Sequence, residues 1–525
     1  MKRSIPYSVV FLFAFLLNRI AVSARQISPL ESIRPLSVLF ALLGVLVFII
    51  HKFVREWHRT NYLTALILGA FFLYQTLYQW IKQVSIERSN TAGLLLIPFV
   101  IGICMLLAGR KWWNLVHEPA QITYYLSLVA VIFLTMQVVQ FGFKFQGIWM
   151  SGSTSHTSAI APLVEEVNLH PATRPDIYVI VLDGYGRQDV LQDIYHYDNS
   201  EFIGQLEKRG FYVAADSHSN YVQTAYSIAS LMNFDYVQPW QPSTDYAEYI
   251  VGPIQHNRVF ELLRKVGYTT VSFEGGTSYT GIQSSDIVDS GFLPLNTFET
   301  FLLTNSPFEP LTNIFHLGIS IPNYDTHRDR ILNHLGTLEN VPDSIQGPKI
   351  TYFHILAPHP PFVFDQDGNP IEPNRPYSIL DGNEYAGSVE EYWQGYRQQV
   401  IFVNGRILEA IDAILAKSQT PPVILVMGDH GPGSMFRWDP QDPGCTWERT
   451  HNFYALLLPA PRNPVTLYPS MTPVNTFRLI FNAYFDTDLP LLDDRTFLVT
   501  WQHPAPIIDA TSFRDSKNSC VPDDK

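Results

Sequence analysis

Five apolar stretches dominate the first 150 residues, and they constrain the fold more than any other feature of the sequence. Each is close to the roughly 20 residues that a helix needs to cross a hydrocarbon core about 30 Å thick. They run at about Ile5–Val22, Leu36–Ile50, Tyr62–Trp80, Ala92–Ala108 and Ile122–Phe143. The sequence therefore predicts a helical bundle of about five transmembrane spans over residues 1–145, in a multi-pass protein of the cell (plasma) membrane.

The first stretch has two interpretations. Lys2-Arg3, the apolar run Val9–Leu17 and the small-residue ending Val22-Ser23-Ala24 are also typical of a secretory signal peptide. Asn18 and Arg19 interrupt the stretch and leave the choice open. We favour an uncleaved span. The later spans keep their sides of the membrane under both interpretations.

Charge gives the orientation of the spans and excludes one class of partner. With the N-terminus inside, seven Lys/Arg lie in cytoplasmic segments and five in outer ones, a slight positive-inside bias. An odd number of spans then puts the rest of the chain on the extracytoplasmic side. Residues 1–150 hold 13 Lys/Arg and 4 Asp/Glu, whereas the remainder holds 22 and 44. So acidic a domain argues against nucleic-acid binding, which depends on basic side chains facing phosphates.

A linker at residues 146–175 precedes a domain at 176–505, and residues 506–525 form a C-terminal tail. Within the domain, buried-type strands alternate with helices, which predicts an α/β fold with a mostly parallel sheet flanked by helices. The expected strands are Ile177–Leu182, Phe211–Ala214, Thr269–Phe273, Ile350–Leu356, Val423–Met427 and Phe453–Leu458. The expected helices are Glu201–Arg209, Ala225–Met232, Asn257–Val266 and Tyr396–Ala416.

Residues suited to metal binding or acid–base chemistry gather at the ends of these strands. In open α/β sheets, ligands bind beyond the carboxyl ends of the strands. The residues are Asp183 after the first strand, His354 and His359 in and after the fourth, Asp429 and His430 after the fifth, and His451 just before the last. Each one alone has an ordinary structural explanation, such as a turn or a satisfied core histidine. Together they favour a metal site.

The order of these motifs resembles the alkaline phosphatase/sulfatase superfamily. The shared elements are strand-Asp-Gly, a Thr-x-x-Ser-like helix start, His-x-x-x-x-His-x-Pro, Gly-Asp-His-Gly and a final His. Several spans followed by an external domain resemble, within that superfamily, lipoteichoic acid synthases and lipid A phosphoethanolamine transferases. The resemblance implies an alkaline-phosphatase-like, or sulfatase-like, catalytic domain.

The resemblance also implies roles for particular residues. Asp183, Asp429 and His430 would bind a divalent metal (Zn, Mn or Mg), with Thr224 as fourth ligand and nucleophile. Thr224 would be the N-cap of the expected helix Ala225–Met232, where free backbone N–H groups and the helix dipole favour an anion. A capping role alone explains Thr224 equally well. His359 and His451 would steady substrate oxygens or protonate the leaving group, and His354 would support the site or hold a second metal.

Some features depart from the family pattern. The Cys/Ser-x-Pro-x-Arg segment of true sulfatases is missing, and Gly184 follows Asp183 where sulfatases usually have a second Asp. We therefore expect a membrane-anchored phosphotransferase or phosphodiesterase acting on a membrane lipid or lipid-linked substrate, with a glycan as possible acceptor. The alternatives are a sulfuric or phosphoric monoester hydrolase, and an inactive envelope-binding or assembly protein. Cys445 and Cys520 can pair if the domain is extracytoplasmic.

Overall fold

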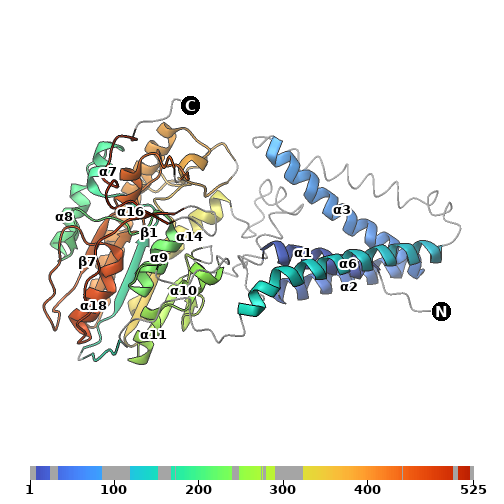
Figure 1. Cartoon of the computed structure of the whole chain (residues 1–525), viewed down its shortest axis with the longest axis horizontal. Helices are drawn as coiled ribbons and strands as arrows, with labels where there is room; N and C mark the ends of the chain where they lie inside the picture. The colour runs from blue at the N-terminus through green and yellow to red at the C-terminus, as the bar shows by residue number, and fades with distance from the viewer. Residues whose placement is uncertain are drawn as a thin grey trace. The chain divides into compact units, whose positions relative to one another are not determined.

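The structure is a computed structural model of the 525-residue chain, and it describes residues 7–23, 33–84, 119–151, 167–171, 173–238, 247–273, 275, 279–289, 323–375, 377–439, 441–499 and 507–520. The chain divides into two compact units. One contains helices α1, α2, α3 and α6, and the other contains strands β1 to β9 with the helices between them (Figure 1). Each unit has an apolar core of its own.

Four predicted spans coincide with helices of the first unit, and the fifth, Ala92–Ala108, lies outside the described residues. The helices are α1 (Tyr7–Ser23), α2 (Ile33–Val54), α3 (Trp57–Val84) and α6 (Pro119–Ser151). Within the described residues, one helical segment is long and apolar enough to cross a membrane, Arg34–Val54, with a mean hydropathy of 2.4. Tyr7–Leu17 and Thr123–Val139 are apolar but shorter. The five-span arrangement is therefore not confirmed.

The helices of this unit pack through small apolar and aromatic contacts. Leu12 and Leu16 of α1 are buried together with Leu43 of α2. The rings of Phe11 and Phe133 lie 6.4 Å apart and join α1 to α6. The outer face of α2 is also apolar, and its Leu42, Phe48 and Phe53 side chains are exposed.

The second unit is built on a seven-stranded sheet with the order β2-β7-β6-β1-β5-β3-β4. Its strands are β1 (Ile177–Leu182), β2 (Tyr212–Val213), β3 (Thr269–Phe273), β4 (Ile287–Asp289), β5 (Lys349–Ile355), β6 (Val423–Gly428) and β7 (Tyr454–Leu457). Pairing is parallel from β6 through β4, while β7 is antiparallel to both β6 and β2. The predicted mostly parallel sheet is confirmed.

Helices cover both faces of this sheet (Figure 1). β1 is central, so its alternate side chains enter two different cores. Val179 and its same-face neighbours pack with α9 (Thr224–Asn233), α10 (Gly252–Gln255), α11 (Arg258–Lys265) and α18 (Thr476–Tyr484). Ile180 and its neighbours pack with α7 (Gln188–Asp193), α8 (Ser200–Lys208), α14 (Tyr324–Leu338) and α16 (Val389–Lys417). The site described below lies at the carboxyl edge of this sandwich.

Helices α16 and α9 begin earlier than the sequence predicts, and the start of α9 bears on the site. α16 begins at Val389 instead of Tyr396, because Ser388 and Glu391 form a capping box that starts the helix before its apolar stripe is continuous. α9 begins at Thr224 itself, with Gln223 as its N-cap. Thr224 is thus the first helical residue and not the predicted cap.

The C-terminal segment packs onto the second unit. Strand β9 (Ile508–Asp509) pairs with β8 (Phe497–Leu498), so the predicted tail continues the fold. A disulfide joins Cys520 to Cys445, a pairing that the sequence alone left open. Shorter elements complete the described chain: η2 (Ala247–Val251), α15 (Val341–Ser344), η3 (Gly382–Glu384), α17 (Thr446–Thr450) and η4 (Pro473–Asn475).

Candidate metal centre and nucleophile

Three neighbouring strands bring the predicted ligands to one edge of the sheet. β1 lies between β5 and β6, and its last residue, Leu182, is in register with Ile355 and Gly428. Asp183 follows β1 directly, and Asp429-His430 follows Gly428. Parallel strands end at the same edge, so residues far apart in sequence become neighbours there.

Four side-chain atoms converge at this edge. His430 Nε2 lies 3.1 Å from Thr224 Oγ1, 3.4 Å from Asp429 Oδ2 and 3.7 Å from Asp183 Oδ1. All four residues are buried. Asp183, Asp429 and His430 form a group of potential metal ligands whose donor atoms all lie within 4.8 Å of one another. The structure thus brings together the four residues that the sequence predicts as a metal site.

The hydrogen bonds of His430 identify which of its nitrogens can bind a metal. Its Nδ1 lies 2.9 Å from the Gly431 carbonyl oxygen, which can only accept, so Nδ1 carries the proton. Nε2 therefore presents a lone pair to Thr224 and the two carboxylates. Burial and the nearby Arg449 guanidinium lower the pKa of His430, which favours this neutral form. A carbonyl on the far nitrogen is a common way to orient a metal-binding imidazole.

The carboxylates fit a divalent cation. Asp183 Oδ1 and Asp429 Oδ2 are buried, and neither has a hydrogen-bond partner among the described residues. Burying such oxygens without a partner is costly. Burial opposes ionisation of Asp183, but the His359 and His354 imidazoles outweigh it and lower its pKa. Two carboxylates, a bare imidazole nitrogen and a hydroxyl make a donor set that suits Zn²⁺ or Mn²⁺ and also admits Mg²⁺.

The loops after β1 and β6 each contain a glycine that their backbone geometry requires. Gly184 has φ of +70°, a conformation that glycine adopts without strain, and its N–H donates to Asp429 Oδ1 at 3.0 Å. A Cβ on Gly431 would lie 2.1 Å from the Glu448 carbonyl oxygen. Ser227 Oγ of α9 donates to the Asp429 carbonyl oxygen at 2.7 Å and ties the loop to the helix that carries Thr224.

Thr224 lies in the first turn of the ten-residue helix α9. Backbone N–H groups at a helix N-terminus and the positive end of the helix dipole favour a negatively charged group there. The hydroxyl of Thr224 thus combines contact with the metal ligands and a location that suits a phosphoryl or sulfuryl oxygen.

His354 supports Asp183. Its Nε2 lies 3.2 Å from Asp183 Oδ2, and its Nδ1 lies 3.1 Å from the Tyr352 hydroxyl. The carboxylate can only accept, so Nε2–H donates to Asp183 while Nδ1 accepts from Tyr352. This arrangement fixes the orientation of Asp183 and leaves its other oxygen, Oδ1, facing His430. The predicted supporting role fits this geometry.

His359 borders the same site. Its backbone N–H donates to the Asp183 carbonyl oxygen at 3.0 Å, which couples the loop after β5 to the loop after β1. Its Nδ1 lies 2.6 Å from the Pro360 carbonyl oxygen and so carries a proton. Its Nε2 lies 3.7 Å from Asp381 Oδ2. His359 is therefore a neighbour of the predicted metal ligands.

The structure does not bring His451 to this group. Its Nε2 lies 3.1 Å from Asp515 Oδ1, and its ring packs at 4.5 Å, centroid to centroid, against that of His218. His451 is the C-cap of the short helix α17, which turns the ring toward the C-terminal segment. The prediction that it contacts substrate beside Thr224 therefore has no geometric support.

Sequence reasoning missed a buried ion pair beside the site. Arg449 Nη1 lies 2.5 Å from Asp381 Oδ2, and the two side chains are only 2% and 4% exposed. Arg449 Nη2 also lies 3.1 Å from His430 Nε2. Although burial opposes it, Arg449 and His359 lower the pKa of Asp381. Arg449 sits two residues before His451 and its partner lies in an irregular segment, so no spacing rule signals the pair.

No family model and no curated protein sequence matches the chain. Similar solved structures include the C-terminal periplasmic domain of EptC from Escherichia coli in complex with Zn (11% identity, 68% of this chain and 99% of that one, TM-score 0.41). Another is the phosphonate monoester hydrolase of Agrobacterium radiobacter (11%, 62% and 80%, TM-score 0.41). A third is the periplasmic domain of the phosphoethanolamine transferase EptC from Campylobacter jejuni (11%, 54% and 79%, TM-score 0.32). At these identities and TM-scores, the likenesses assign neither a substrate nor a reaction to this chain.

Proposed function

We propose that the chain is a metal-dependent phosphotransferase or phosphodiesterase with Thr224 as its nucleophile. The observation that supports this most directly is the convergence of Thr224 Oγ1, Asp183 Oδ1, Asp429 Oδ2 and His430 Nε2. The two orphaned carboxylate oxygens carry the negative charge that one divalent cation balances. When bound, such a cation supplies Lewis acidity, which lowers the pKa of an alcohol and polarises a phosphoryl oxygen.

The reaction has two displacement steps. Thr224 Oγ1 forms a bond to phosphorus while the bond from phosphorus to the leaving alcohol oxygen breaks. The threonine hydroxyl loses its proton to solvent, and the leaving oxygen takes a proton from His359, the imidazole beside the site. In the second step, another alcohol, or water, gives its proton back to His359 while its oxygen forms a bond to the phosphorus of phospho-threonine. The bond from phosphorus to Thr224 Oγ1 breaks, and Oγ1 takes up a proton from solvent to restore the hydroxyl.

Arg449 is suited to hold the phosphoryl group. Its Nη2 shares His430 Nε2 with Thr224 Oγ1, at 3.1 Å in each case. A cation on that nitrogen would free Nη2 to donate to a phosphoryl oxygen. Asp381 holds the other side of the guanidinium, and the aromatic rings of Phe436 and Trp438 lie 5.4 and 5.1 Å from its central carbon. A held guanidinium is well suited to bind phosphate.

We also propose that about five spans anchor this domain outside the cytoplasm, with a phospholipid headgroup, a lipid-linked substrate or an envelope glycan as substrate. The apolar outer face of α2 supports membrane contact, because exposed Phe48 and Phe53 are unfavourable in water. The Cys445–Cys520 disulfide supports an oxidising compartment. Anchoring would keep the site close to a lipid donor and raise its effective concentration.

The test is to trap the covalent intermediate. Full-length protein loaded with Zn²⁺ or Mn²⁺ is mixed with bis(p-nitrophenyl) phosphate, quenched in acid and examined by peptide mass spectrometry. We expect an aryl phosphate on Thr224 and no adduct in Thr224→Ala. The control is Ser230→Ala, which should give an unchanged adduct, because Ser230 lies in the same helix but its hydroxyl donates to the Asp235 carbonyl oxygen beyond the helix end. An adduct elsewhere, or turnover that survives Thr224→Ala, contradicts the proposal.

Substrate preference separates the alternatives. A phosphodiester-specific enzyme cleaves the aryl diester and phosphatidylethanolamine or phosphatidylglycerol vesicles faster than p-nitrophenyl phosphate or p-nitrophenyl sulfate. The reverse preference identifies a monoester hydrolase. A protein that binds no metal and cleaves none of these compounds is an inactive binding or assembly protein.

A further inference from the structure

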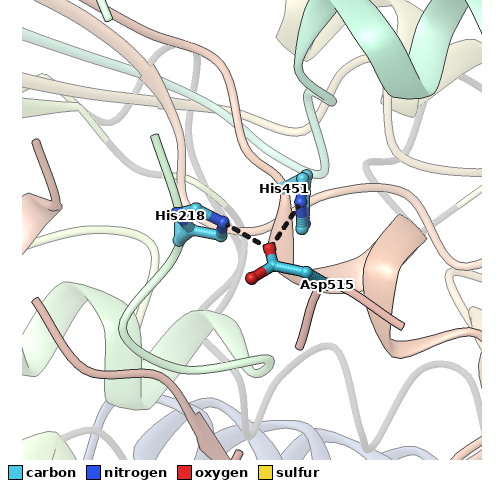
Figure 2. A group of neighbouring side chains, drawn as sticks. All are labelled: His218, His451 and Asp515. Atoms are coloured by element: carbon cyan, nitrogen blue, oxygen red, sulfur yellow. Dashed lines mark hydrogen bonds and ion pairs between the residues drawn. The ribbon is translucent and has the colours of Figure 1, made fainter. Parts of the chain in front are cut away.

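His218, His451 and Asp515 form a second group of potential metal ligands, drawn in Figure 2. His218 Nε2 and His451 Nε2 lie 3.0 and 3.1 Å from one oxygen, Asp515 Oδ1, and the three donor atoms all lie within 4.8 Å of one another. The two imidazoles are buried, while the Asp515 side chain is 64% exposed. The three residues come from the segment before α9, the end of α17 and the C-terminal segment.

Hydrogen bonding leaves His451 Nε2, the ring nitrogen that faces Asp515, without a proton to donate. The Thr450 hydroxyl donates to the Thr446 carbonyl oxygen at 2.9 Å, so toward His451 Nδ1, 3.1 Å away, it acts as acceptor. His451 Nδ1 then carries the proton, and Nε2 points its lone pair at Asp515 Oδ1. Two lone pairs at 3.1 Å repel each other. A cation between them removes the repulsion.

The surroundings favour neutral imidazoles, the form that binds metals. Burial lowers the pKa of His218 to about 4 and, together with the Arg187 guanidinium, also lowers the pKa of His451. Two of the three nearby cations have carboxylate partners of their own, since Arg187 pairs with Asp189 and Lys517 with Asp193, each at 2.7 Å.

The third cation, Arg514, does not contact the carboxylate oxygen that faces the two imidazoles. Arg514 Nε approaches the other oxygen of the carboxylate, Asp515 Oδ2, at 3.9 Å. Asp515 Oδ1 thus stays available to the imidazoles.

We propose that His218 Nε2, His451 Nε2 and Asp515 Oδ1 bind a zinc ion, with water as the fourth ligand. Two imidazoles and a carboxylate are ligands that zinc prefers. In a tetrahedron with bonds of about 2.0–2.2 Å, neighbouring ligand atoms lie roughly 3.3–3.6 Å apart. The observed separations of 3.0 and 3.1 Å differ from this by a few tenths of an ångström. Exposure of Asp515 gives water access to the ion.

Backbone contacts connect this second site to the loop that carries the first, although the two sites share no ligand. The His451 carbonyl oxygen accepts from Arg187 N at 2.9 Å, and Asn452 bridges to Gly186, in the loop that begins with Asp183. The Cys445–Cys520 disulfide joins the same two segments as His451 and Asp515. Zinc would thus add a second cross-link between α17 and the C-terminal segment.

The test counts zinc in the full-length protein. Protein is stripped with a chelator, dialysed against dilute Zn²⁺ and then against metal-free buffer, and analysed by elemental mass spectrometry. We expect two ions per chain in the wild type and one in His218→Gln and in Asp515→Asn. Asp515 is exposed, so its variant is expected to fold even if His218→Gln does not. The control His170→Gln changes an exposed histidine outside both groups and should keep two ions.

Comparison with Asp429→Asn keeps the two sites distinguishable. Loss of one ion in Asp515→Asn together with retention of that ion in Asp429→Asn supports the second site, even if the wild type holds no ion at Asp429. If His218→Gln and Asp515→Asn keep the wild-type count, the second site does not exist and Asp515 only hydrogen-bonds to His218. A chelator should also lower the melting temperature of Asp429→Asn, and equal melting with and without chelator overturns the inference.

Discussion

Replacing Asp381 by Asn tests whether the buried ion pair beside the site is as important to the fold as its geometry indicates. Asp381 Oδ2 and Arg449 Nη1 lie 2.5 Å apart, with side chains 4% and 2% exposed. Asn keeps the size of the side chain but removes its charge, so the Arg449 guanidinium stays buried with a neutral partner. Breaking a buried pair on one side costs about 3–5 kcal/mol. For a domain of this size, that corresponds to a fall in melting temperature of roughly 5–10 °C.

The chain contains a matched control for this substitution. Arg437 Nη1 and Asp442 Oδ2 also lie 2.5 Å apart, but their side chains are 33% and 63% exposed. An exposed pair contributes about 0–1 kcal/mol, because water solvates each charge once the partner is gone. Asp442→Asn should therefore lower the melting temperature by no more than about 2 °C.

The assay is thermal unfolding of the full-length variants by differential scanning fluorimetry at one pH and metal concentration. A double variant, Asp381→Asn with Arg449→Met, should recover much of the loss, because the buried charge is then removed too. Equal shifts for Asp381→Asn and Asp442→Asn would refute the reasoning, since burial would then make no difference to the value of the pair.

Three further perturbations have definite expected outcomes. Burial lowers the pKa of His327 to about 3, so between pH 6.5 and 3 the unfolded chain binds one more proton at this residue than the folded chain does. The free energy of unfolding should therefore fall as the pH falls through this range. His327→Gln should reduce the slope of unfolding free energy against pH by about 1.4 kcal/mol per pH unit, measured from denaturation midpoints. Cys520→Ser should destabilise the domain by about 2–4 kcal/mol, and a wild-type protein equally stable with and without reductant would contradict this. Gly431→Ala should abolish metal binding at Asp429, because the new Cβ would clash with the Glu448 carbonyl oxygen. The control Gly204→Ala in α8 has open space around the new Cβ and should fold and bind metal normally. Equal metal counts for the two variants would contradict the expected clash.

The strands and most helices of the second unit could be predicted because their signals are local. Ile177–Leu182 and Val423–Met427 are uninterrupted apolar runs, and both form buried strands at the expected positions. The direction of β7 could not be predicted, because Phe453–Leu458 reads the same in a parallel and an antiparallel pair. The start of α16 depends on a capping box, a signal in Ser388 and Glu391 that apolar periodicity does not include.

The candidate site likewise contains residues that local sequence signals predict and residues that they do not. Asp183, Asp429 and His430 come straight from strand ends, so their meeting follows from a parallel sheet. His451 shows what motif order leaves out, because the direction of its ring is set by the turn at the end of α17. Asp381 and Arg449 meet only through tertiary structure, and no local pattern marks either of them.

The most direct measurement is an anomalous difference map from a crystal of the full-length protein grown with Zn²⁺ or Mn²⁺. The account predicts a peak bounded by Asp183 Oδ1, Asp429 Oδ2, His430 Nε2 and Thr224 Oγ1, with distances of roughly 2.0–2.2 Å for zinc. A well-ordered crystal with no peak there, or with the Thr224 hydroxyl turned away from the ion, would contradict it.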